Sequence, residues 1–130
     1  MSNVDIVRAF YGGLGRGDVP AAMGLLASEI EWTEAERFPY FAGTWRTPEA
    51  VVDGLLSRLN RDWLDFSAEA KMFVADGELV VAFGDYAGTN RLTGRSMTAP
   101  FAHCWTVRQG KIAAFVQYTD TAKVLEAMQK

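Results

Sequence analysis

The chain has 130 residues and a formal net charge of −3, with 49% hydrophobic and 22% charged residues. These values predict one globular domain over residues 1–130 with a core of its own. The mildly acidic balance excludes a basic surface for nucleic acid or an anionic membrane, and no apolar run is long enough to span a bilayer. The single cysteine excludes an internal disulfide and favours a cytoplasmic location.

Three helices are predicted in the first sixty residues. Ser2 and Asp5 have the spacing of a capping box before an amphipathic stripe, which predicts a first helix. Asp18 can cap a short second helix. The pair Thr47-Pro48, a cap followed by proline at the first helical position, predicts a third helix that ends near Asn60.

A strand is predicted between the second and third helices. Residues 29–34 alternate, so that Trp32 and Glu34 share one face with an isoleucine. The next segment, 35–46, is rich in aromatic residues, among them Tyr40, and is interrupted by proline and glycine. This composition predicts an ordered loop rather than a linker.

Antiparallel strands are predicted in the second half of the chain. Leu64–Ala75 and Glu78–Thr89 alternate on either side of an Asp-Gly turn, and Ala99–Asp120 forms two strands joined at Gln109-Gly110. A short helix, 120–128, ends the chain. This order predicts an α+β domain in which a curved antiparallel sheet wraps on three N-terminal helices and encloses a pocket.

The hairpin at Gln109-Gly110 carries the predicted site. A two-residue turn there pairs residues whose numbers sum to 219, so His103 lies opposite Val116 and Phe101 opposite Tyr118. One face then carries aromatic side chains beside an imidazole and a carboxylate: Phe101, His103, Trp105, Val116, Tyr118 and Asp120. Placing ionisable groups on an apolar surface costs free energy, so they are normally paired there or have a functional role. This face is therefore the candidate cavity. The opposite face carries Ala102, Cys104, Ala113 and Phe115.

The chain resembles the nuclear transport factor 2-like superfamily and, within it, the SnoaL-like proteins. The matching segments are GRGDVPAAMGLL, EIEWTE, TWRTPEAVVDGLL, VADGELV and FAHCWTVRQGKIAAFVQYTD. The resemblance implies a conical α+β barrel and a homodimer formed through the outer face of the sheet. The superfamily includes ketosteroid isomerases, polyketide cyclases, dehydratases, epoxide hydrolases and non-catalytic binding modules, so the fold alone does not decide the function.

The resemblance also implies roles for single residues. The general base of the isomerases falls at Glu34, and a proton-donating oxyanion group falls near His103. The isomerase tyrosine on the first helix falls at Phe10, which has no hydroxyl and argues against steroid isomerisation. The acid/base aspartate of the SnoaL-like cyclases is similar in position to Asp120.

Each titratable candidate also has a structural interpretation. Glu34 can be a strand-end carboxylate in solvent or paired with Arg37, and His103 a core histidine bonded to Tyr118 or a carboxylate. Asp120 can be the N-cap of the last helix, a role compatible with catalysis. Among the carboxylates, Asp120 is the preferred acid/base.

The predicted function is cofactor-independent acid/base chemistry (isomerisation, cyclisation or dehydration) on a small hydrophobic carbonyl compound. The catalytic candidates are Asp120, His103 and Glu34, and the predicted substrate-binding residues are Trp32, Tyr40, Phe101, Trp105 and Tyr118. No metal, cofactor or nucleic-acid partner is predicted. The alternative is a non-catalytic ligand-binding or dimerisation module. An enzyme requires at least two of the three catalytic candidates to open into one enclosed pocket.

Overall fold

A computed structural model describes residues 1–130. The helices are α1 (Asn3–Gly15), α2 (Val19–Met23), α3 (Pro48–Val51), the π-helical turn η1 (Val52–Leu56), α4 (Ser57–Asp62) and α5 (Thr121–Ala127). The strands are β1 (Leu26–Thr33), β2 (Thr44–Trp45), β3 (Trp63–Asp76), β4 (Leu79–Asn90), β5 (Ser96–Arg108) and β6 (Lys111–Thr119). No helix is both long and apolar enough to cross a membrane.

The predicted helix caps are present. The Ser2 hydroxyl accepts from the Asp5 N–H, while the Asp5 carboxylate accepts from the Ser2 N–H, as in a capping box. The Asp18 side chain caps α2 and the Thr47 hydroxyl caps α3, each followed by proline in the first turn. Local capping chemistry therefore fixes where these helices begin.

The three N-terminal helices of the prediction are not confirmed, because four α-helices precede β3. The predicted third helix is interrupted by η1, which separates α3 from α4. A Cβ at Gly54, in the middle of η1, would lie 2.6 Å from Nε1 of Trp45. The close approach of the Trp45 indole thus requires glycine at this wide turn.

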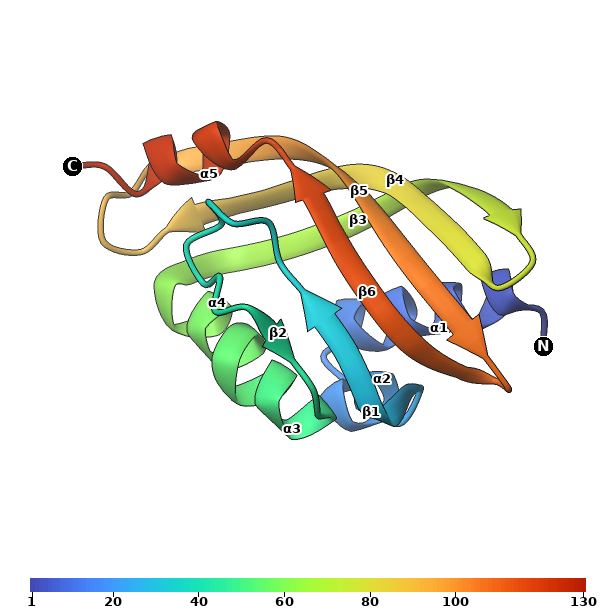
Figure 1. Ribbon diagram of the computed structural model, residues 1–130. Coiled ribbons are helices and arrows are strands. Elements are labelled where there is room, and N and C mark those ends of the chain that lie inside the picture. Colours follow the sequence, from blue (N-terminus) through green and yellow to red (C-terminus); the bar gives the residue numbers. More distant parts are fainter.

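The six strands form one mixed sheet with the order β2-β1-β6-β5-β4-β3. The strands β3 to β6 pair antiparallel as predicted, but β1 pairs parallel with β6. The sheet is strongly curved and is not closed, so the predicted barrel is wrong in that respect (Figure 1). Its edges are β2 and β3.

The hairpin between β5 and β6 is confirmed, but its predicted register is wrong beyond the turn. Thr106 pairs with Ala114 while Val107 pairs with Ile112, so Ala113 is an extra residue in β6. Because side chains alternate along a strand, one extra residue moves every later side chain of that strand to the opposite face of the sheet. As a result Phe115 points inward and is 2% exposed, whereas Tyr118 is 58% exposed.

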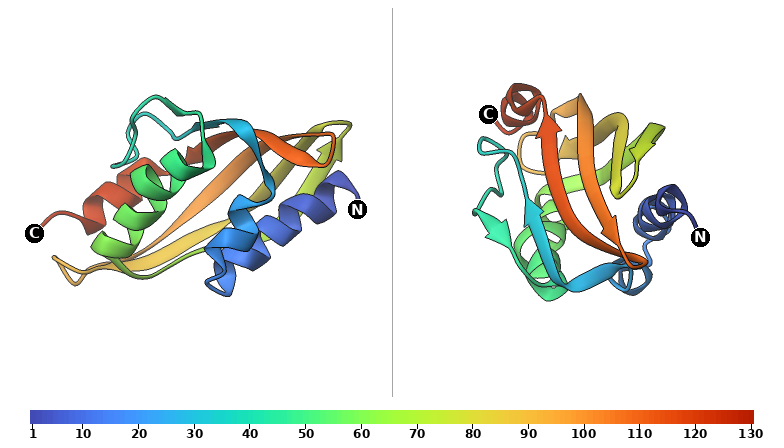
Figure 2. Two further views of the ribbon diagram at one scale, coloured as in Figure 1. Left: turned by 90° about the horizontal axis from the view of Figure 1, so that it is seen from below. Right: turned by 45° about the vertical axis from the view of Figure 1, so that its right-hand side comes forward.

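The helices α1, α2, α3 and α4 lie on the concave side of the sheet, and α5 lies at one end (Figures 1 and 2). No helix covers the convex face of β5 and β6, which faces the viewer in Figure 1. The core, including Phe10, Trp105 and Ile112, fills the concave side. The concave side therefore contains both the core and the space for a site.

Candidate functional site

A cavity of about 640 Å³ lies between the concave face of the sheet and the helices α1, η1 and α4. Most of its lining side chains are apolar. Its titratable lining includes Glu34 and His103, together with the hydroxyls of Tyr11 and Tyr86. Two of the three predicted catalytic residues thus share one cavity.

Glu34 directly follows β1 and is 3% exposed. Its Oε1 accepts a long hydrogen bond of 3.4 Å from Nε1 of Trp32, and its Oε2 has no hydrogen-bond partner. Burial raises the pKa of this carboxyl to about 8, because water no longer stabilises its charge. A buried carboxyl with a free oxygen and a pKa near neutrality has the properties of a general base.

The position of Glu34 follows from the parallel pairing of β1 with β6. Trp32 lies opposite Phe115 and stacks on it with ring centroids 4.0 Å apart. Beyond the end of β1, the Ala35 N–H donates to Oε1 of Gln117 at 3.0 Å. These contacts fix the backbone on both sides of Glu34.

His103 is 4% exposed and lies between two tyrosine hydroxyls. Its Nδ1 is 2.5 Å from Oη of Tyr11, and its Nε2 is 2.5 Å from Oη of Tyr86. The ring stacks on Phe101 at a centroid distance of 3.8 Å. Burial lowers the pKa of this imidazole well below its usual value, so His103 is neutral at pH 7.

Each tyrosine hydroxyl also accepts a hydrogen bond from another side chain. Nε1 of Trp105 donates to Tyr11 at 3.0 Å, and Nε2 of Gln117 donates to Tyr86 at 2.8 Å. Burial raises the pKa of both phenols, so both stay protonated at neutral pH. The cavity thus contains neutral hydroxyl donors together with a carboxyl group.

The predicted aromatic residues occupy three different environments. Trp32 and Trp105 line the cavity as predicted. Phe101 is buried under His103, and Tyr40 is buried where its hydroxyl donates to Asp62 at 2.7 Å, so neither is part of the cavity lining. Tyr118 points away from the cavity because of the β6 bulge, which makes its predicted position wrong.

Asp120 does not line the cavity. Its side chain is half-buried and accepts from the Lys123 N–H at 3.4 Å, so it forms the N-cap of α5. The prediction that it ends the inward face of β6 fails because the bulge reverses that face. A catalytic role for Asp120 stays a prediction without geometric support.

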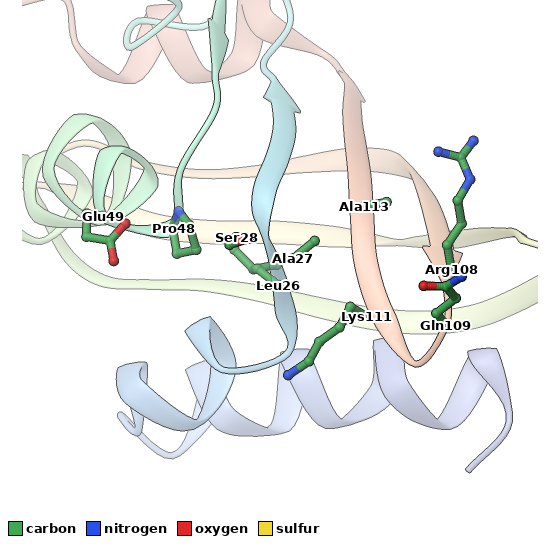
Figure 3. A pocket seen from close by; sticks show the side chains of 9 residues that line it. All are labelled: Leu26, Ala27, Ser28, Pro48, Glu49, Arg108, Gln109, Lys111 and Ala113. Carbon is green, nitrogen blue, oxygen red and sulfur yellow. The ribbon is translucent and has the colours of Figure 1, made fainter.

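A second hollow, of about 620 Å³, lies beside the β5–β6 turn and the start of β1 (Figure 3). Its charged side chains do not converge on one point. Lys111 donates to the backbone oxygen of Gly24 at 2.6 Å, and Arg108 pairs with Glu78 at 3.1 Å. Its two cationic side chains are thus already paired with the protein itself, so we assign no chemistry to this hollow.

Sequence reasoning missed Tyr11, Tyr86 and Gln117. Tyr11 is on the inner stripe of α1, where the spacing indicates a core residue. Tyr86 alternates with Val80 and Ala82 on the inward side of β4, a signal that a comparison of adjacent strands could have found. The wrong register places Gln117 on the outside. No cluster of three or more His, Cys, Asp or Glu side chains is arranged to hold a metal ion.

The sequence profile of the SnoaL-like domain matches residues 7–115. The chain belongs to the SnoaL-like domain family. No curated protein matches it in sequence. A solved NTF2-like protein from Burkholderia thailandensis E264 is 38% identical to this SnoaL-like protein, covers 100% of it and 99% of its own chain, and superposes with a TM-score of 0.96.

Two more distant structures share the fold of the SnoaL-like protein. TerC, co-crystallised with polyporic acid, is 23% identical, with 98% of each chain covered and a TM-score of 0.87. A candidate polyketide cyclase from Xanthomonas campestris pv. campestris is 19% identical, with 98% of this chain and 96% of its own covered and a TM-score of 0.85.

The first helix supplies a hydroxyl to the cavity although Phe10 has none. Phe10 is buried in the core and 1% exposed, but the next residue, Tyr11, presents its hydroxyl to the cavity. The missing hydroxyl at Phe10 is therefore no argument against isomerase-like chemistry in this SnoaL-like protein.

Proposed function

We propose that this SnoaL-like protein catalyses cofactor-independent proton transfer on a hydrophobic carbonyl compound, in an isomerisation, cyclisation or dehydration. Glu34 takes the proton from the carbon next to the carbonyl, so that the C–H bond breaks and an O–H bond forms on the carboxylate. The electron pair moves to the carbonyl oxygen, which accepts a hydrogen bond from a tyrosine hydroxyl. In an isomerisation Glu34 returns the proton to another carbon of the enolate. In a cyclisation the enolate carbon bonds to a second carbonyl carbon, whose oxygen takes the proton, and in a dehydration the proton goes to a hydroxyl group that leaves as water.

The observation that carries this proposal is the shared cavity of Glu34 and the hydroxyls around His103. A base and an oxyanion donor must converge on one substrate to act together. The unpartnered Oε2 of Glu34 has a free lone pair for a proton from the substrate. The neutral phenols can donate to an enolate oxygen without first losing a charge.

The substrate class follows from the walls of the cavity. Its lining is mostly apolar, with the indoles of Trp32 and Trp105 among the large surfaces, which favours a planar or polycyclic compound. Two proteins of the same fold support this substrate class: one was co-crystallised with polyporic acid, and the other is a candidate polyketide cyclase.

The experiment uses 2-tetralone, a bicyclic ketone with acidic protons next to its carbonyl. In deuterated buffer, the wild-type protein should accelerate deuterium incorporation at these carbons, as followed by proton NMR. 2-Naphthol, a planar analogue of the enol, should bind the same cavity and inhibit the exchange. Binding of 2-naphthol with no acceleration of exchange would contradict the enzymatic proposal and favour the alternative, a ligand-binding module.

We also propose that the protein is a homodimer formed through the convex face of the sheet. Two cross-strand rows of mainly apolar side chains lie on that face: Val81, Cys104 and Val116, and Phe83, Ala102 and Tyr118. Phe83 is 38% exposed and Val116 is 36% exposed in the single chain. An apolar sheet face of this kind is normally covered, and an identical face is self-complementary in a two-fold dimer.

Phe83→Glu is expected to convert the dimer to a monomer, because it places two charges in the centre of the apolar interface. Light scattering at micromolar concentration measures the mass. Leu92→Glu is the matched control, because Leu92 is 74% exposed at the β4–β5 turn and is not in either apolar row. This variant should remain dimeric. A monomeric mass for the wild-type protein would contradict the proposal.

A further inference from the structure

His103 connects two tyrosine hydroxyls into one hydrogen-bonded chain. The chain runs from Nε1 of Trp105 to Tyr11, His103, Tyr86 and then Nε2 of Gln117. Every polar atom in the chain is buried or partly buried, so water does not complete its hydrogen bonds freely. The number of protons in the chain can therefore be counted.

The two ends of the chain both donate toward its centre. The indole N–H of Trp105 can only donate, so Tyr11 accepts from it. The amide of Gln117 is oriented by its Oε1, which accepts from the Ala35 N–H, so its Nε2 donates to Tyr86. Each tyrosine oxygen thus already accepts one hydrogen bond, and each keeps one proton to donate.

The imidazole in the centre has one proton to donate. Its partners are the two tyrosine hydroxyls, and neither ring nitrogen contacts a carboxylate. The cavity that it lines also contains the titratable groups of Glu34, Asp65 and Arg91, and the Arg91 guanidinium donates to the backbone oxygens of Asn60 and Trp63 rather than to His103. A neutral imidazole has one N–H and one lone pair. It therefore accepts from one tyrosine and donates to the other, and the tyrosine that accepts from it has a free O–H.

The position of Glu34 decides which tyrosine has the free proton. Hydrogen bonds connect the segment of Glu34 to Tyr86: the N–H of Ala35, the next residue, donates to Gln117, whose Nε2 donates to Tyr86, and both Glu34 and Tyr86 line the cavity. In agreement with this arrangement, an ionised Glu34 raises the pKa of the Tyr86 phenol further. When Glu34 is ionised, which its pKa of about 8 places in the alkaline range, the proton of Tyr86 is more stable pointing toward this negative charge than pointing toward His103. Tyr11 lies among the rings of Phe73, Phe101 and Trp105 and can give its proton to Nδ1 of His103.

We infer that His103 is a positioning residue, held as the Nε2–H tautomer, which leaves Tyr86 as the hydrogen-bond donor to the substrate oxygen. The proton of Tyr11 is donated to Nδ1, and the Nε2–H is donated to the oxygen of Tyr86. The Tyr86 O–H then points into the cavity, beside the base. The assignment of the donor to a substrate rests on the proposed function, whereas the tautomer itself does not.

His103 is the only histidine in the chain, so every imidazole signal belongs to it. Long-range proton–nitrogen NMR correlations of protein labelled with ¹⁵N-histidine distinguish the two neutral tautomers and the imidazolium. The expected result at pH 9, where Glu34 is ionised, is the Nε2–H pattern. An Nδ1–H pattern would overturn the assignment of the free hydroxyl proton to Tyr86. An imidazolium pattern would show two protons on the imidazole instead of one and would also overturn the inference.

Two matched variants each remove one hydroxyl from His103. In Tyr86→Phe the Nε2–H of His103 loses its acceptor. Buried N–H groups without a partner are rarer in proteins than acceptors without one. The ring should therefore switch to the Nδ1–H tautomer, which donates to Tyr11. In Tyr11→Phe the Nε2–H keeps its acceptor, and the pattern should not change. If both variants show the same tautomer, the assigned direction of the hydrogen bonds through His103 is wrong. A histidine that only packs in the core would not change its tautomer.

The exchange of 2-tetralone gives the functional readout. Tyr86→Phe should lose about 10²–10³-fold in rate, as for the removal of an oxyanion donor, and Tyr11→Phe less than about tenfold. A larger loss in Tyr11→Phe would overturn the role of Tyr86. If the wild type does not exchange 2-tetralone at all, the proposed function fails, whereas the tautomer measurement still decides the direction of the chain.

Discussion

Glu34→Gln is expected to reduce the catalysed deuterium exchange of 2-tetralone by about 10²–10⁴-fold, the usual loss when a general base is removed. Glutamine has nearly the same shape as glutamate but cannot take a proton. In the wild type, the rate should rise about tenfold for each pH unit and level off near pH 8, because Glu34 has a pKa of about 8 and acts only when ionised.

Asp120→Asn is the matched control, since it also converts a carboxylate to an amide. Asparagine caps helices nearly as well as aspartate, so α5 should keep its N-cap. Because Asp120 does not line the cavity, exchange should stay at the wild-type rate. Full activity in Glu34→Gln, with a loss in Asp120→Asn, would return the catalytic role to Asp120.

Glu34→Gln is also expected to stabilise the protein at alkaline pH. The carboxyl titrates near pH 4.5 in the unfolded chain and near pH 8 in the folded protein. Between these values the folded state binds more protons, so the free energy of unfolding of the wild type falls as the pH rises. Over the whole window the loss is on the order of 3–5 kcal/mol, and the variant, whose amide does not ionise, avoids this loss.

Urea unfolding of both proteins at pH 4, 6 and 9 measures this difference. The two free energies of unfolding should be similar at pH 4, and the variant should be more stable by several kcal/mol at pH 9. A constant difference across the range would show that Glu34 is not desolvated in the folded state. A stabilising change that removes activity is typical of a functional site.

The positions of Glu34 and His103 were predictable because regular strands keep their alternation. Trp32 on β1 and Glu34 directly after it both point into the cavity, as their spacing indicates, and His103 is inward on β5 with Trp105. The capping residues predicted the starts of the helices, since capping depends on local geometry. These predictions needed no information about distant contacts.

The position of β6 was not predictable in the same way. The Gln109-Gly110 turn fixes the pairing of its immediate neighbours, but the extra residue Ala113 shifts every later pair. Nothing in the local pattern distinguishes an inward Phe115 from an inward Val116, because both are apolar. Packing of Phe115 on Trp32, across the parallel contact with β1, decides between them.

The hydroxyls around His103 could not be assigned from one strand alone. Tyr86 lies opposite Ala99 in the β4–β5 ladder, four residues from the partner of His103, and its long side chain reaches back along the strand. Tyr11 comes from a helix that is far away in the sequence. The site therefore depends on the curvature of the sheet and on how α1 crosses it, which the sequence pattern does not specify.

The titration of the Glu34 carboxyl tests the central claim most directly. In protein labelled with ¹³C at the glutamate Cδ, the signal that is absent from Glu34→Gln identifies Glu34, and its chemical shift can be followed with pH. We predict a midpoint near pH 8, well above those of the exposed glutamates. A midpoint near pH 4.5 would show a solvated carboxylate and would contradict a base buried in the cavity.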